Sequence, residues 1–172
     1  MEISFAIDSV PEPQGSVKAF IMEGRVDPRN PCTEDGKPIW VTKPRSILTS
    51  DNPDLKAFRR HISSEAHNAL VRAKVPKPMA GKHVPVEVGI RFTFVKPPSV
   101  SAKRTQMVVR PDVDKLARAT MDAMTGVLFE DDAQVVEISA RKQYGPRERV
   151  EVRVRVLDPV ATTLDLPLVE EF

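Results

Sequence analysis

Two aspartates, Asp112 and Asp114, lie two residues apart where an amphipathic pattern begins, directly after Arg110 and Pro111. Helix N-termini favour acidic side chains, so either aspartate also suits a helix cap. A cap accounts for a single carboxylate and does not account for the further acids that follow along the chain. The pair is therefore a candidate for metal binding.

More charged side chains are spaced to join this pair. On a helix that starts here, Asp114, Arg118 and Asp122 follow one another at intervals of four residues and share one face. Asp131 and Asp132 come after a short apolar segment, and they reach the pair if that segment lies beside the helix. Converging carboxylates repel one another unless a cation lies among them, so the pattern predicts a bound metal ion.

The ligand types indicate which metal this site takes. The available donors are oxygens, and neither the single cysteine nor the three histidines have zinc-ligand spacing. We therefore expect Mg²⁺, with Mn²⁺ as a substitute. Mg²⁺ in a basic surround suits phosphodiester hydrolysis. Arg118 then either neutralises the scissile phosphate or forms an ion pair with Asp114 or Asp122.

Charge is segregated along the chain although its formal net value is only +2, from 26 basic and 24 acidic residues. Residues 96–118 and 141–155 each contain six bases and two acids, whereas residues 119–140 contain five acids and no base. A basic surface around an acidic cluster suits a polyanion held near a cation. Ordinary solvated strand and helix faces would give the same pattern.

Hydrophobic periodicity predicts two main helices, at about 53–73 and 112–125, with Gly126 as the stop of the second. Alternating patterns predict strands at 3–7, 17–22 and 86–94. A hairpin of 136–140 and 150–156 is predicted through Gly145-Pro146, and an irregular loop over 99–109. These elements predict an α+β fold with a mixed β-sheet.

The length of 172 residues and the 41% of hydrophobic residues predict one globular domain over 1–157, followed by an acidic tail over 158–172. No apolar run approaches the ~18 residues of a membrane-spanning helix, and the first residues lack the build of a signal peptide. One cysteine allows no intrachain disulfide. We therefore expect no membrane association and a cytoplasmic location.

The segment that carries these residues reads Arg110-Pro-Asp-Val-Asp-Lys-Leu-Ala-Arg-Ala-Thr-Met-Asp-Ala-Met-Thr-Gly-Val-Leu-Phe-Glu-Asp-Asp-Ala-Gln-Val-Val136. It resembles the RusA family of Holliday-junction resolvases. That family has Asp-x-Asp-Asn, a basic residue four positions after the second Asp, an Asp-Ala pair four further on, and then Asp-Asp-x-Gln-Val. The resemblance extends over residues 110–145 with matching spacing.

The resemblance implies a RusA-like fold and a homodimeric, Mg²⁺-dependent endodeoxyribonuclease, common in phage and prophage genomes. Such enzymes nick four-way DNA junctions symmetrically in DNA recombination and repair. By position, the catalytic metal ligands are Asp112, Asp114 and Asp132, and Asp131 is their neighbour in the metal site. Arg118 occupies the essential basic position, where a lysine is usual, and keeps its charge with a different donor geometry. Lys115 replaces the usual asparagine.

Several basic residues are candidates for contacts with the phosphates of branched DNA. They are Lys18, Lys43, Arg45, Lys103, Arg104, Arg110 and Lys115. A different class of function remains open, namely a non-catalytic architectural protein that binds junctions and uses its acids structurally. It differs from the nuclease in that DNA is not cleaved in the presence of Mg²⁺. A third alternative is another Mg²⁺-dependent phosphotransfer enzyme that acts on small substrates, which would show little salt-dependent affinity for DNA.

Overall fold

The computed structural model describes residues 1–15, 17–50 and 52–157 of the chain. Within the predicted domain 1–157 the structure separates two compact units, one formed by residues 1–14 with residues from 54 onward, the other by residues 15–53. The predicted acidic tail, residues 158–172, lies outside the described residues.

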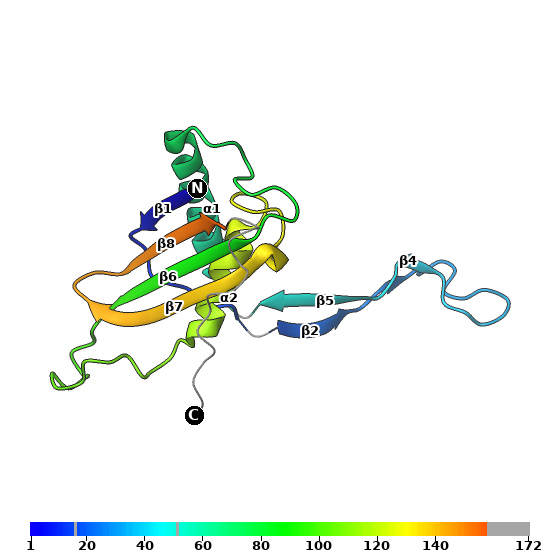
Figure 1. Cartoon of the computed structure of the whole chain (residues 1–172). Coiled ribbons are helices and arrows are strands. Elements are labelled where there is room, and N and C mark those ends of the chain that lie inside the picture. The colour runs from blue at the N-terminus through cyan, green and yellow to red at the C-terminus, as the bar shows by residue number, and fades with distance from the viewer. Residues whose placement is uncertain (16, 51, 158–172) are drawn as a thin grey trace, which may run out of the picture. The chain divides into compact units, whose positions relative to one another are not determined.

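The first unit is built on a four-stranded sheet with the order β1-β8-β6-β7 (Figure 1). Its strands are β1 (Glu2–Ile7), β6 (Val86–Val95), β7 (Val135–Gly145) and β8 (Arg149–Val156). β6 pairs with β7 in parallel and with β8 antiparallel, and β8 pairs antiparallel with β1. The sheet is mixed, which confirms the predicted α+β class.

The predicted hairpin of the last two strands is wrong in its pairing. Both strands form, but β6 lies between β7 and β8 and hydrogen-bonds to each of them. Alternation and turn residues locate strands without identifying their neighbours. Residues 146–148 connect β7 to β8 across the end of β6, a distance of two inter-strand spacings, or about 10 Å. The residues of β6 explain its central position, because seven of its ten are buried, as a central strand requires.

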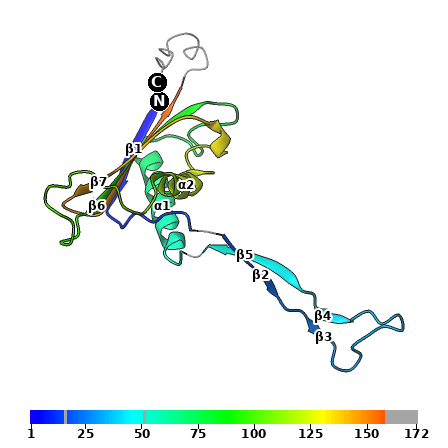
Figure 2. The same ribbon diagram turned by 90° about the horizontal axis from the view of Figure 1, so that it is seen from below.

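Two helices cover one face of this sheet, α1 (Leu55–Ala73) and α2 (Val113–Met124), as Figure 2 shows from below. Both confirm the periodicity of the sequence. α1 ends at Lys74, in the left-handed region, and α2 is followed by Gly126 with φ of 74°. A positive φ favours glycine, so Gly126 ends the second helix at the predicted residue.

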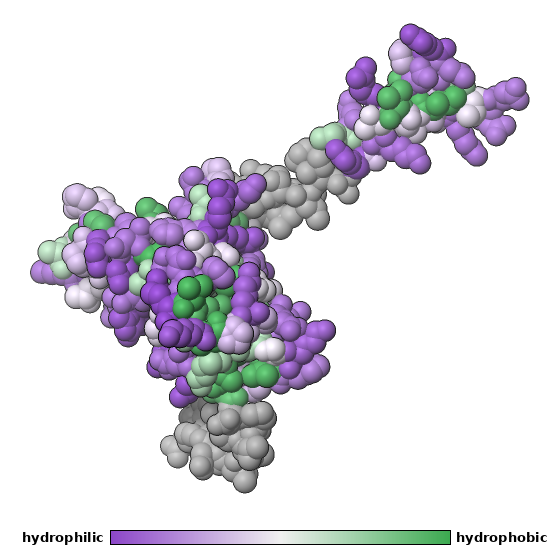
Figure 3. Space-filling view, turned by 90° about the horizontal axis from the view of Figure 1, so that it is seen from above, coloured by the Kyte–Doolittle hydropathy of each residue, from purple (hydrophilic) through white to green (hydrophobic). Residues whose placement is uncertain are grey.

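The core lies between the helices and the sheet. Alternate residues of the strands point into it, among them Ile3, Phe5, Val88, Phe92 and Val152, all below 8% exposed. The opposite face of the sheet has no helix over it (Figure 2). Hydrophilic residues predominate on the face drawn in Figure 3. No helix among the described residues combines the length and the apolar character needed to cross a membrane.

The second unit consists of two short antiparallel pairs. β2 (Val17–Met22) pairs with β5 (Arg45–Ser50), and β3 (Arg25–Val26) pairs with β4 (Trp40–Thr42). The predicted strand over 17–22 is confirmed. A Cβ on Gly24 would lie 2.4 Å from the Thr42 carbonyl oxygen and 2.6 Å from Cε3 of Trp40. The close approach of the chain before β3 to β4 therefore requires glycine at this position.

Candidate active site

The start of α2 presents the two predicted carboxylates to solvent. Asp112 occupies the N-cap position with an extended backbone (φ −73°, ψ 136°), yet its side chain accepts no capping hydrogen bond. Asp114 lies in the first turn and is exposed, as Asp112 is. The Nζ of Lys115 lies 3.7 Å from Oδ2 of Asp112, a contact between two half-exposed side chains. Neither carboxylate is therefore committed to capping the helix.

The segment before Asp112 is tied to the sheet by Lys142 of β7. The Lys142 Nζ donates hydrogen bonds to the carbonyl oxygens of Val109 and Pro111, both at 2.7 Å. Lys142 is opposite Phe92 in the ladder, so it stands on the sheet face that carries the helices. The chain thus enters α2 from an anchored position.

Arg118 is exposed on α2, one turn beyond Asp114. Among the described residues, it forms no ion pair with Asp114 or Asp122. Asp122 is paired instead with Arg59 of α1. Of the two roles predicted for Arg118, the ion pair along the helix is not formed, and within the described part of the chain its guanidinium has no ion-pair partner, which leaves it available to an external anion.

The second group of acids lies in a tight turn, the 3₁₀ helix η1 (Asp132–Gln134) that leads into β7. Asp131 caps this turn, with its Oδ1 accepting from the Ala133 backbone N–H at 2.9 Å. The Gln134 Oε1 accepts from the backbone N–H groups of Glu130 (2.8 Å) and Asp131 (3.0 Å), completing a capping box. Asp132 is exposed, and its side chain makes no such bond to any residue that the structure describes.

Gln134 also fastens the turn to a neighbouring loop. Its Nε2 donates to the carbonyl oxygens of Gly81 (2.7 Å) and Val84 (3.0 Å). A groove of about 480 Å³ lies beside this turn and is lined in part by Lys82, His83 and Asp131. Every polar group of the Gln134 amide is therefore used to fix the backbone that carries Asp132.

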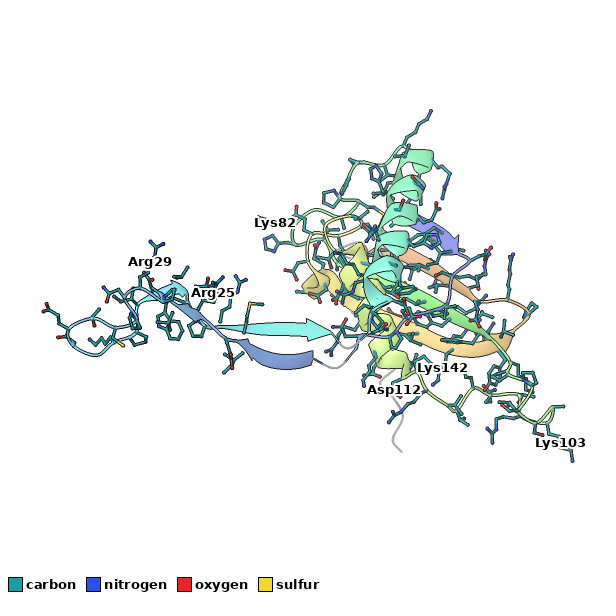
Figure 4. All side chains as sticks on the ribbon, turned by 180° about the vertical axis from the view of Figure 1, so that it is seen from behind. Arg25, Arg29, Lys82, Lys103, Asp112 and Lys142 are labelled. Atoms are coloured by element: carbon teal, nitrogen blue, oxygen red, sulfur yellow. The ribbon has the colours of Figure 1, made fainter. Side chains whose placement is uncertain are left out.

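The two acidic groups lie at opposite ends of α2 and β7. The Gly126 N–H donates to the Phe129 carbonyl at 2.7 Å, so the chain leaves for Asp132 from the C-terminal end of α2, while Asp112 is at its N-terminal end. Twelve helical residues span about 18 Å. Along β7, the seven steps from Val135 to Lys142 span about 23 Å. Figure 4 places Asp112 beside Lys142, and Lys82 at the far end of the sheet.

Because of this separation, a single chain does not bring Asp132 close to Asp112 and Asp114. Within the part of the chain that the structure describes, no three His, Cys, Asp or Glu side chains lie close enough to hold a metal ion. Asp112 and Asp114 both lie at the start of α2, and Asp132 lies apart from them, beyond the C-terminal end of the helix. The sequence analysis predicted that these acids lie close together if the segment after α2 runs back beside the helix. In the structure, that segment instead leaves α2 at its C-terminal end and keeps Asp132 there.

The predicted DNA-contacting residues are distributed over both units. Lys103, Arg104 and Arg110 are exposed on the loop that precedes α2, which contains no helix or strand, as predicted. Lys96 organises this loop through hydrogen bonds to the carbonyls of Ala102 (3.2 Å) and Arg104 (2.8 Å), and its Nζ lies 5.8 Å from the ring centre of Tyr144. The tip with Lys103 projects from the unit in Figure 4.

Three of the remaining basic candidates belong to the second unit. Lys43 and Arg45 are exposed there, next to β4 and at the start of β5. The side chain of Lys18 lies outside the described part of the structure. Lys115, in the first turn of α2, is engaged with Asp112.

The helix-free face of the sheet is also rich in arginine, over a groove of about 700 Å³ with Gly89 and Ser139 among its lining. Most of these arginines form ion pairs within the chain. The pairs are Arg91 with Glu151 (3.2 Å), Arg149 with Asp8 (2.7 Å), Arg153 with Glu87 (2.9 Å) and Arg155 with Glu87. Of the arginines on this face, Arg141 is exposed and forms no ion pair among the described residues. The four paired arginines share three carboxylates, so this face keeps an excess of positive charge, most of it held in ion pairs.

Comparison with known proteins identifies the family. Residues 28–155 match the family model "Endodeoxyribonuclease RusA", so the chain belongs to this family. The uncharacterized protein YqaN of Bacillus subtilis (strain 168) is 25% identical over 160 residues, covering 89% of this chain and 95% of YqaN. The crossover junction endodeoxyribonuclease rusA of Lactococcus phage r1t is 26% identical over 100 residues, covering 56% of this chain and 73% of the phage protein.

The sequence did not indicate the roles of Gln134 and of Lys142, which was considered only as a phosphate contact, although each left a signal. Gln134 lies three residues after Asp131, the spacing of a capping box, which predicts the turn that the structure contains. Lys142 continues the alternation of Ile138 and Ala140 and is therefore a lysine on the helix-facing side of its strand. A charged residue in such a position requires polar partners, and the carbonyls of the loop supply them.

Proposed function

We propose that this chain is a Mg²⁺-dependent endodeoxyribonuclease that resolves four-way DNA junctions by paired, symmetric nicks, and that it works as a homodimer. The observation that carries this proposal is the pair Asp112 and Asp114. It lies at the start of α2 with both carboxylates free of capping bonds, in a chain of the RusA endodeoxyribonuclease family.

The residues at this end of α2 suit Mg²⁺. This ion is commonly held by one or two carboxylates together with waters and substrate phosphates, so Asp112 and Asp114 meet the requirement without a third ligand from the same chain. Mn²⁺ shares the preference for oxygen donors and should substitute. When bound, the metal ion polarises the phosphoryl oxygens and lowers the pKa of a bound water.

Arg118 serves the phosphate in this proposal. Its guanidinium is exposed one turn from Asp114 and makes no ion pair in the described part of the chain. Arginine binds phosphate oxygens through two parallel N–H donors, and it stays protonated at all working pH values. It therefore neutralises charge on the scissile phosphate but does not donate a proton to the leaving oxygen.

A second subunit supplies the missing acid. Because Asp132 lies at the other end of α2 from Asp112 and Asp114, we infer that Asp132 of the partner subunit completes each site. A two-fold dimer then contains two equivalent sites, which matches the two cuts needed on a nearly two-fold symmetric junction. Asp131 has a different task, because its carboxylate already caps the turn that presents Asp132.

The loop before α2 provides the first contacts with DNA. Lys103, Arg104 and Arg110 are exposed on it, next in sequence to the candidate metal ligands. Contacts of this kind bind phosphates without regard to sequence and make affinity fall with salt. Cutting of branched DNA places the protein in recombination and repair.

The test is a nicking assay on a labelled immobile four-way junction beside a linear duplex of the same arms, with Mg²⁺ or EDTA, for wild type and Asp114→Asn. The proposal predicts paired, ligatable nicks on opposing strands of the junction, made only by wild type and only with Mg²⁺ or Mn²⁺. Tight junction binding without cleavage in either metal would instead identify an architectural junction-binding protein.

A further inference from the structure

The hydrogen bonds of Lys142 give a basic residue beside the candidate site a role that its charge alone does not indicate. A lysine ammonium has three N–H donors, and two of those on Lys142 are bound to main-chain oxygens at 2.7 Å. The two acceptors, Val109 and Pro111, lie on either side of Arg110. The side chain is partly buried, with its stem on the helix-facing side of β7.

These carbonyl groups belong to the stretch that delivers the carboxylates. Pro111 immediately precedes Asp112, and residues 109–111 lie outside any helix or strand. A connecting segment of this kind has no hydrogen-bond ladder of its own, so its path depends on the contacts that hold it. Lys142 joins it to β7, which is itself paired along its whole length with β6.

We propose that Lys142 is a positioning residue of the nuclease site: by binding the carbonyls of Val109 and Pro111, it fixes the direction in which Asp112 and Asp114 leave the loop. This inference rests on the proposed function. Lys142 does not touch the scissile phosphate, because its ammonium is engaged with the chain's own backbone. A displacement of about 1 Å in a reacting group costs as much as about a hundredfold in rate, so anchoring the loop matters for the chemical step.

Arg141 provides a matched control. It is the next residue on β7, points to the opposite sheet face, is exposed and forms no ion pair among the described residues. Arg141→Met and Lys142→Met each remove one positive charge from adjacent positions of the same strand. They differ in that Lys142→Met also releases the two loop carbonyls.

The experiment measures junction affinity in EDTA at several salt concentrations and the single-turnover cleavage rate at saturating protein. Lys142→Met is expected to lower the cleavage rate by about 10- to 100-fold and to leave junction affinity within about twofold of wild type. Lys142→Arg, which keeps the charge and the N–H donors, should recover most of the rate. Arg141→Met should cleave at the wild-type rate.

The contrary result is equally distinct. If Lys142→Met weakens junction binding and flattens its salt dependence, while cleavage at saturation equals that of wild type, Lys142 is a phosphate contact and the proposal is overturned. Unchanged affinity together with unchanged cleavage would also overturn it, because the loop would then hold its position without the lysine.

Amide hydrogen exchange over residues 107–114 gives a readout that does not depend on activity. Lys142→Met, or Lys142→Gln if the first variant does not fold, should exchange faster in this segment and at the wild-type rate in α1, whereas Lys142→Arg should exchange close to the wild-type rate in both. Unchanged exchange would overturn the anchoring role. If wild type nicks no junction under any condition, the proposed function fails by itself, and the exchange data still decide whether Lys142 holds the loop.

Discussion

The two ends of β7 use the same device for different purposes. At one end, the neutral amide of Gln134 binds four backbone groups and closes the turn of Asp131 and Asp132. At the other end, the charged ammonium of Lys142 binds two carbonyls before Asp112. In each case one residue, the last of η1 or one within β7, fixes an irregular segment that carries acids. The strand thus separates the two anchored segments by the length from Val135 to Lys142, about 23 Å.

The ends differ in how their acids are used. At the Gln134 end, Asp131 is committed to a capping bond and Asp132 is free. At the Lys142 end, neither Asp112 nor Asp114 caps the helix, although Asp112 occupies the capping position. Acidic residues near helix starts are therefore not equivalent, and only the hydrogen bonds separate structural carboxylates from those available to a ligand.

The largest effect is expected from neutralising a free carboxylate. Loss of a residue that merely supports a metal ligand typically costs 10- to 100-fold, so Asp114→Asn should lower cleavage by at least about a hundredfold. Asp131→Asn should stay within about threefold of wild type, because asparagine caps as well as aspartate. Single-turnover nicking of the junction measures both. Equal inactivation by the two variants would remove the distinction between capping and free acids.

The next effect concerns stability at the Gln134 end. Gln134→Ala leaves the carbonyls of Gly81 and Val84 and two N–H groups without their partner, which should cost about 2 kcal/mol in the free energy of unfolding. For a chain of this size the Tm should fall by about 4–8 °C. Gln143→Ala is the control, since its amide makes one long bond of 3.5 Å to Thr93. An unchanged Tm for Gln134→Ala would mean that the turn holds without the amide.

A smaller effect, on the salt dependence of junction affinity, is expected from the loop before α2, which Lys142 anchors. Each phosphate contact contributes about 0.9 to the slope of log affinity against log salt for duplex DNA. The double variant Lys103→Ala/Arg104→Ala should therefore reduce the slope by up to about 1.8. Lys56→Ala/Arg60→Ala removes the same charge from exposed positions of α1 and serves as the control. If the two double variants show the same slope, the loop makes no specific contribution.

The smallest effect is expected from Lys115, whose ammonium lies 3.7 Å from Oδ2 of Asp112. An exposed pair of this kind contributes at most about 0.5 kcal/mol, so Lys115→Asn should leave stability nearly unchanged. The ammonium competes with a cation for the same carboxylate, and its removal should lower the Mg²⁺ concentration for half-maximal cleavage a few-fold. A Mg²⁺ titration of the cleavage rate checks this. A higher requirement would show that Lys115 assists the site.

Local patterns were sufficient for most elements of this fold. The three- and four-residue spacing from Leu55 to Leu70 located α1, and Gly126 marked the end of α2. The alternation of hydrophobic residues located β7 and β8 correctly. It led to a wrong prediction that the two strands pair as a hairpin, because periodicity does not show which strand lies between them. The ladder of β6 with both is a long-range property of the chain.

The candidate site was predictable in its residues more than in its geometry. The acids and Arg118 follow from spacing and from the family pattern. Their distribution over two ends of α2 does not, because it depends on the turn at Gly126 and on the bond from Gln134 to Gly81, fifty-three residues away in sequence. The hydrogen bonds of Lys142 could not be predicted either, because they also join residues that are far apart in the sequence. Residues 109–111 show no period, and their anchor lies on a later strand.

The most direct test of the account mixes two inactive variants. Asp114→Asn and Asp132→Asn subunits, carrying different tags, are combined under conditions that exchange subunits, and nicking of the junction is measured. If the acids at the two ends of β7 act in one site supplied by two subunits, each variant alone is inactive. The mixture then recovers roughly a quarter of wild-type nicking, as single cuts, because each mixed dimer has one intact site. Inactivity of mixed dimers that co-purify through both tags would contradict the shared site.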